Sequence, residues 1–97
     1  MHEPHYIIEL SATYFGVRAA DMCTKKNIIN VSSARKVSYV LLRKYCALEA
    51  YRIGFIFGVT EGYVKDILTA SRTNVLICNA VKAIEDKYLT NKNKEVG

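Results

Sequence analysis

Residues 50–69 restrict the fold of this chain more than any other stretch. Two helix-like apolar runs flank a short connection that contains Gly58, and Gly54 lies one helical turn earlier. Two helices that cross through a turn of three or four residues need a small residue where they touch and a residue tolerant of positive φ in the turn. Gly54 and Gly58 meet these two requirements, so the pattern predicts a helix-turn-helix over about residues 50–71.

Apolar residues in the same stretch have the spacing that such a crossing needs: Ile53, Phe57, Val59, Val64 and Ile67. Thr60 is a good N-cap for the second helix. Because each of these features is common alone, an arbitrary helical hairpin that uses glycine is the alternative. Their agreement favours the helix-turn-helix, in which the second helix enters the major groove of DNA and the first crosses the backbone.

The rest of the chain has helical periodicity as well. We expect a helix over residues 5–15 closed by Gly16, a short helix over 17–23, a polar loop from 24 to about 31, and a last helix over about 74–88. The chain has no alternating runs typical of strands and no internal repeat. It is predicted to be an all-α single domain of five to six helices spanning residues 1–90, with a frayed tail at 91–97.

Between the polar loop and the helix-turn-helix, the sequence predicts a long helix that starts after the capping residues Ser32 and Ser33. Its apolar stripe consists of Val37, Val40, Leu41 and Tyr45. We expect the opposite, strongly basic side to carry Arg35, Lys36, Tyr39 and Arg43.

Positive charge is concentrated in one quarter of the chain. The whole chain has a net charge of +5, and residues 25–52 alone contain seven Lys or Arg against one Glu, a net +6. Residues 1–24 sum to −2, with one Arg against three acids. A solvated helix face is the ordinary explanation, but this distribution is also expected if a single face meets nucleic-acid phosphates.

The predicted helix-turn-helix and the basic segment together nominate residues for contact with double-stranded DNA. Candidates for reading base edges are Thr60, Glu61, Tyr63, Lys65 and Thr69. Candidates for contact with phosphates or the minor groove are Lys25, Lys26, Asn27, Arg35, Lys36 and Arg43.

Several stretches in the same order resemble the C-terminal DNA-binding domain of the bacterial chromosomal replication initiator family, DnaA. They are Tyr14-Phe15-Gly16-Val17-Arg18-Ala19-Ala20-Asp21-Met22, Lys25-Lys26, residues 31–41, and Ile53-Gly54-x-x-Phe57-Gly58, within about residues 7–72. The resemblance implies a helix, a basic loop, a long helix and a helix-turn-helix of the Trp-repressor kind. It also implies backbone contacts by Arg35 and Lys36. No Walker motif is present, so the chain resembles the DNA-reading part standing alone without the ATPase domain.

The chain departs from that family where bases are read. The family's loop carries an arginine that enters the minor groove, where this chain has Asn27 or the neighbouring lysines. The family's recognition helix opens with Gly-Gly-Arg-Asp-His-Thr-Thr, whereas residues 58–64 here read Gly-Val-Thr-Glu-Gly-Tyr-Val. Only Glu61 stands in for the Asp, so we expect a different DNA target.

Other functions find little support in the residue types. His2 and His5 lie three residues apart near the terminus, and His2 is on no expected helix, so neither a metal site nor a cofactor is predicted, and general bases are too scarce for an enzyme. Three cysteines in apolar stretches are expected to be reduced core thiols. No segment has the length of apolar residues that a membrane span needs, and we expect a cytoplasmic protein.

The leading hypothesis is sequence-preferring binding of double-stranded DNA by a regulator of transcription or replication. An apolar last helix is more often part of the core than a partner surface, and residues 75–89 are where a homodimer would form. The first alternative is a protein-interaction module that has lost DNA reading, which Glu61 and Asp66 favour. The second is a ligand-gated repressor similar to the Trp repressor, which requires a pocket between helices.

Overall fold

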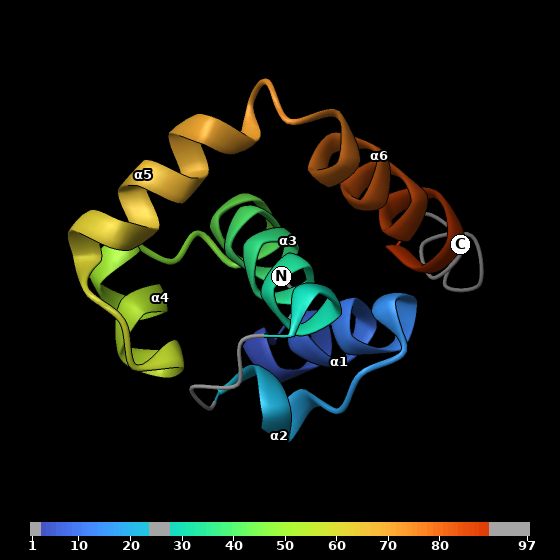
Figure 1. Cartoon of the computed structure of the whole chain (residues 1–97), viewed down its shortest axis with the longest axis horizontal. Helices are drawn as coiled ribbons and strands as arrows, with labels where there is room; N and C mark the ends of the chain where they lie inside the picture. Colours follow the sequence, from blue (N-terminus) through green and yellow to red (C-terminus); the bar gives the residue numbers. More distant parts are fainter. Residues whose placement is uncertain (1–2, 24–27, 90–97) are drawn as a thin grey trace.

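The computed structural model describes residues 3–23 and 28–89, and within these ranges every regular element is a helix (Figure 1). The elements are α1 (Pro4–Phe15), α2 (Ala19–Met22), α3 (Ile29–Tyr45), α4 (Ala50–Phe57), α5 (Glu61–Ser71), α6 (Val75–Ile84) and a closing π-helical turn, η1 (Glu85–Leu89). The described residues contain no strand, so the predicted all-α class is confirmed. Gly16 ends α1 in the left-handed conformation, as predicted.

Helix α3 is the centre of the molecule. It contacts each of the other five α-helices, with α4 and α5 on one side, α6 on the other, and α1 and α2 on a third (Figure 1). Leu41 and Leu42 are fully buried, and so are Ala34 and Val37. Because α3 is covered from several directions, most of its surface belongs to the core.

Helix α3 begins earlier than the sequence predicts. The helix starts at Ile29, so the expected loop up to about residue 31 and the expected caps Ser32 and Ser33 were wrong, since both serines lie inside the helix. The N-cap position is Ile28, whose side chain makes no capping hydrogen bond. Val31 is buried in the core, and burial of its side chain stabilises the additional turn without a cap.

Coverage from α4 also corrects the assignment of Tyr39 to the polar side of this helix. Tyr39 is only 1% exposed and packs edge-to-face on Phe57 of α4, with ring centroids 5.0 Å apart. A helical wheel of α3 alone places Tyr39 beside Arg35, but the α4–α5 pair covers that flank. Val40 and Tyr45, expected in the apolar stripe, are half-buried.

The last helix buries one side and exposes the other. Ile77, Val81 and Ile84 are buried. Val75 and Cys78 are exposed, because successive residues turn by 100° and these two lie outside the buried arc. Cys23 is exposed too, so the prediction of core thiols holds for Cys46 alone.

The α4–α5 pair shows every packing role that the sequence predicts for it. A Cβ atom on Gly54 would lie 2.6 Å from the Val59 carbonyl oxygen, so only glycine lets the two segments approach this closely. Gly58 has a φ of 69°, and the Thr60 hydroxyl accepts a hydrogen bond from the Tyr63 N–H at 3.2 Å. Ile53, Phe57 and Val64 are buried, and Val59 and Ile67 are half-buried.

A polar contact joins the end of α3 to η1. The Lys44 ammonium and the Tyr45 hydroxyl each donate to Glu85 Oε2 at 2.5 Å. Burial acts to raise the pKa of the Glu85 carboxyl, but the hydrogen bonds from Lys44 and Tyr45 and the Lys44 charge outweigh it, so the pKa is lowered. Burial and the Glu85 contact raise the pKa of Tyr45 to about 12. Both groups therefore favour the ionised carboxylate paired with a neutral phenol.

Replacing Gly54 tests the close approach of α4 to the turn. We expect Gly54→Ala to lower the free energy of unfolding in urea by about 1–3 kcal/mol, since the new methyl group meets a backbone oxygen that cannot move alone. Gly62→Ala is the matched control, because open space surrounds that position on an exposed helix. It should leave stability unchanged or raise it by up to about 1 kcal/mol. Equal losses in both variants would contradict the close contact.

The Glu85 contact predicts a pH dependence. Because the folded-state pKa of Glu85 lies below its ordinary value of 4.5, the contact stabilises the fold above that pH and is lost as the pH falls through the lowered value. The difference in unfolding free energy between the unmodified protein and Glu85→Gln should therefore be largest near pH 7 and shrink below pH 4.5. Asp86→Asn is the control, and a Glu85→Gln difference independent of pH would refute the assignment.

Candidate nucleic-acid interface

Three of the residues proposed for DNA contact line one surface hollow. Arg35 and Tyr39 of α3 face Val59, Thr60 and Tyr63, which lead into the N-terminus of α5, around a space of about 350 Å³. The structure thus brings together two base-reading candidates, Thr60 and Tyr63, and one phosphate candidate, Arg35. Arg35 lies 25 or more positions before Thr60 and Tyr63 in the sequence, and it meets them because α5 packs against α3.

The hollow has the electrostatic character of an anion site. The N-terminus of a helix carries partial positive charge on N–H groups that have no partner within the helix. Arg35 adds a full charge beside it, and Gly62 leaves open space over the first turn of α5. Burial and the neighbouring Tyr63 raise the pKa of Tyr39 to about 12, although Arg35 acts in the opposite direction, so its phenol stays neutral. The arrangement suits an anionic oxygen at the surface.

Arg35 also has a structural role that sequence reasoning missed. Its Nε donates to the Met22 carbonyl oxygen at 2.6 Å, and its Nη2 donates to the Asp21 carbonyl oxygen at 3.4 Å. These bonds hold the C-terminal end of α2 against α3. The candidates Lys25, Lys26 and Asn27 follow α2 directly, and they lie outside the described residues.

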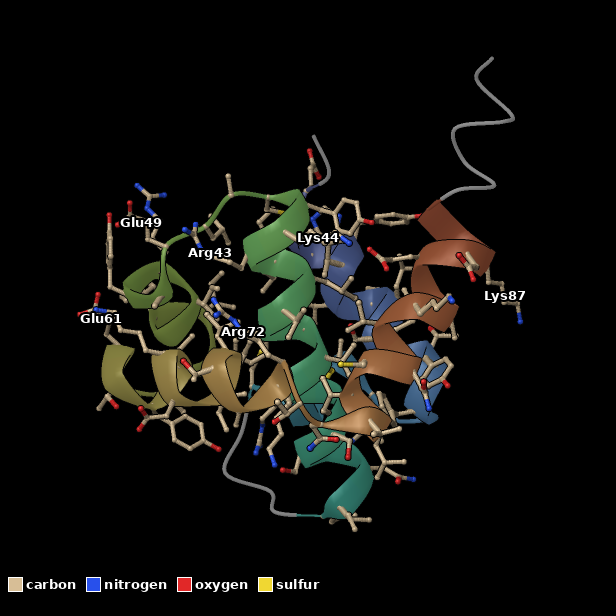
Figure 2. All side chains as sticks on the ribbon, turned by 90° about the horizontal axis from the view of Figure 1, so that it is seen from above. Arg43, Lys44, Glu49, Glu61, Arg72 and Lys87 are labelled. Atoms are coloured by element: carbon tan, nitrogen blue, oxygen red, sulfur yellow. The ribbon has the colours of Figure 1, made fainter. Side chains whose placement is uncertain are left out.

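The outward side of α5 carries the remaining base-reading candidates with little net charge. Glu61, Lys65 and Thr69 are exposed, and Glu61 stands at the outer edge of the molecule in Figure 2. Lys65 Nζ lies 3.7 Å from Glu61 Oε2, an exposed pair whose attraction water and salt largely screen. Asp66 is exposed on the same helix. Strong attraction to phosphates must therefore come from the surface outside this side of α5.

The other phosphate candidates are not gathered at the hollow. Lys36 and Arg43 are seven residues apart and so share one face of α3, where Lys36 is half-buried. Arg43 donates to the Leu48 carbonyl oxygen at 3.4 Å and lines a different groove, together with Arg72. Arg72, at the C-terminal end of α5, was missed because it lies outside the basic segment 25–52.

The described residues also bear on other functions. Residues 3–23 and 28–89 hold no group of three or more His, Cys, Asp or Glu side chains placed to share a metal ion. In the same part of the chain, each helix is too short or too polar to cross a bilayer.

Comparison with known proteins finds similarity to one kind of protein. The chain is 29% identical over 86 residues, which is 89% of its length, to the chromosomal replication initiator protein DnaA of Tropheryma whipplei strain Twist. The same values hold for DnaA of strain TW08/27. The chain spans 18% of the length of these relatives. No family model matches it. The likeness is consistent with a DnaA-related domain.

The bonds made by Arg35 predict that it stabilises the fold as well as the interface. We expect Arg35→Gln to lower the free energy of unfolding by about 1–3 kcal/mol, because a charged donor to two backbone carbonyl groups is lost. Lys36→Gln, its neighbour on α3, should change stability by less than about 0.5 kcal/mol. Chemical denaturation of both variants measures the difference. Equal stabilities would mean that the α2 contact does not hold in solution.

Proposed function

We propose that this chain binds double-stranded DNA with a sequence preference and acts as a regulator of replication or transcription. In this proposal it corresponds to the C-terminal DNA-binding domain of DnaA, and the α4–α5 pair is a helix-turn-helix of the Trp-repressor kind. The observation that carries it is the hollow in which Arg35, Thr60 and Tyr63 meet at the N-terminus of α5. The similarity to a replication initiator over 89% of the chain supports it.

In the proposed complex α5 lies in the major groove. Its first turn and outward side offer two hydroxyl groups and an ammonium from Thr60, Tyr63 and Lys65, all exposed and able to donate to base edges. The Tyr63 ring also suits contact with a thymine methyl group or a sugar. Glu61 accepts from a cytosine amine, a contact that replaces its pairing with Lys65. Thr69 lies about two turns after Glu61 on the same helix.

Affinity comes from phosphate contacts beside this helix. Arg35 and the N-terminus of α5 hold one phosphate at the hollow, and Lys36 extends the contact along α3. The lysines at 25 and 26 precede α3 and are proposed to reach the backbone or the minor groove. Because α5 itself is close to neutral, binding depends on these flanking cations and weakens steeply with salt.

A protein-interaction module is the second candidate, and one feature of α4 favours it. Tyr51 and Phe55 lie one helical turn apart and are 53% and 89% exposed. Exposed aromatic side chains of this kind often anchor protein interfaces.

On α6, Val75 and Leu76 are 70% and 80% exposed and are the residues through which a homodimer would form.

Variants of α5 and α3 distinguish contacts with base edges from contacts with phosphates. Tyr63→Ala and Lys65→Ala should weaken binding to a selected site by about 1–3 kcal/mol more than binding to random DNA. Lys36→Ala should weaken both alike and reduce the slope of log affinity against log salt by about one unit. Fluorescence anisotropy with duplexes enriched from a randomised pool, at two salt concentrations, measures these effects.

Lys82→Ala, an exposed lysine of α6, is the control for loss of a charge away from this surface. It should leave the selectivity for the selected site unchanged. If every variant loses the same affinity for all sequences, the assignment of roles is wrong. Absence of binding even at low salt would favour the protein-interaction module.

A further inference from the structure

A second and larger depression lies on the side of α5 away from Tyr63. Its volume is about 430 Å³, and its walls come from α3, α5 and α6. Apolar side chains form the floor, and two arginines, Arg43 and Arg72, stand among the lining residues. We call this depression the arginine groove and define it by Val40, Leu68, Ile77 and Val81 with Arg43 and Arg72. Arg43 was predicted to contact nucleic-acid phosphates, and none of the other five residues was predicted to form a site.

The cationic side chains around the arginine groove differ in whether they are paired with an acidic group. Lys44 also lines it, but its ammonium is paired with Glu85 at 2.5 Å. Arg72 makes no ion pair with any residue in the described ranges, and the printed contact of Arg43 is a long one, 3.4 Å to the Leu48 carbonyl oxygen. In Figure 2, Arg43 and Arg72 lie on the side of α3 toward α4 and α5, and Lys44 lies beside the C-terminal end of α3. Two of the lining residues thus carry guanidinium groups whose donors no ion pair in the described residues satisfies.

This combination selects a particular ligand chemistry. A depression of a few hundred cubic ångströms with an apolar lining and a few convergent polar groups is typical of small-molecule sites. Guanidinium groups match the planar, bidentate geometry of a carboxylate. We propose that the arginine groove binds a small monocarboxylate with a compact apolar body, its carboxylate held by Arg43 and Arg72 and its body against Leu68 and Val81.

The position of the site connects it to α5. Leu68 and Arg72 belong to the C-terminal half of this helix, whereas Thr60 and Tyr63 stand at its N-terminal end. A ligand that bridges α5 to α3 and α6 stabilises the placement of α5 that it binds most tightly over any other placement. Its occupancy is therefore expected to change DNA affinity, by a factor no larger than the ratio of the ligand's affinities for the two placements. This coupling rests on the proposed DNA binding, while the ligand site itself does not.

The experiment titrates 4-phenylbutyrate into the ¹⁵N-labelled protein and follows backbone amide shifts by NMR. Saturable shifts are expected at Val40, Leu68, Arg72 and Val81. The uncharged 4-phenylbutyramide and the small anion acetate should each bind at least about tenfold more weakly, because one lacks the charge and the other the apolar body. Shifts of equal size with all three compounds, or shifts that fail to saturate, would overturn the proposal.

Substitutions assign the shifts to the groove. Arg72→Gln should weaken 4-phenylbutyrate binding about tenfold, and Lys82→Gln, the same loss of charge elsewhere on the surface, should not. Cys78 lines the groove and Cys23 is an exposed thiol on α2's C-terminal end, so saturating ligand should slow alkylation of Cys78 alone. Equal protection of the two thiols, or unchanged affinity in Arg72→Gln, refutes the site.

The coupling has its own readout. DNA anisotropy with and without saturating 4-phenylbutyrate should show a change in affinity that Arg72→Gln abolishes. Ligand binding by NMR without any effect on DNA overturns only the coupling. Absence of DNA binding under all conditions, with saturable NMR shifts retained, contradicts the proposed function and leaves the ligand site intact.

Discussion

The close approach of Gly54 to the Val59 carbonyl oxygen is the contact on which the candidate interface depends. A Cβ atom at position 54 would lie 2.6 Å from that oxygen, too close for a real contact, so the direction in which the chain leaves α4 depends on the absence of a Cβ atom. Gly58 then reverses the chain through a positive φ, and Thr60 starts α5. These three residues place the N-terminus of α5 against α3, and the hollow with Arg35 and Tyr63 follows from that placement.

The described cationic side chains make different contacts, although they lie close together in the sequence. Arg35 bonds to the α2 carbonyl oxygens and lines the hollow, Lys44 is paired with Glu85, and Arg43 lines the groove together with Arg72. Arg35 and Arg43 of the +6 segment therefore belong to two separate depressions, one on each flank of α5. One suits phosphates beside a groove-reading helix. The other, over an apolar floor, suits a small carboxylate.

Local chemistry explains why some features were predictable and others were not. Gly54, Gly58 and Thr60 are required by backbone geometry alone, so the α4–α5 pair was predicted residue by residue. Tyr39 and the first turn of α3 were misplaced because their burial depends on helices distant in the sequence, and a helical wheel of one segment contains no information about them. The meeting of Arg35 with Thr60 and the groove shared by Arg43 and Arg72 arise from the same tertiary packing.

In the proposed complex the N-terminal part of α5 meets DNA. An NMR titration of the ¹⁵N-labelled protein with a duplex from a selected pool maps this contact, because each amide reports its own surroundings. Binding through this surface should produce shifts concentrated at Arg35, Lys36 and residues 60–65, reversed by added salt. Shifts confined to Tyr51 and Phe55 of α4, or no shifts at low salt, would contradict it.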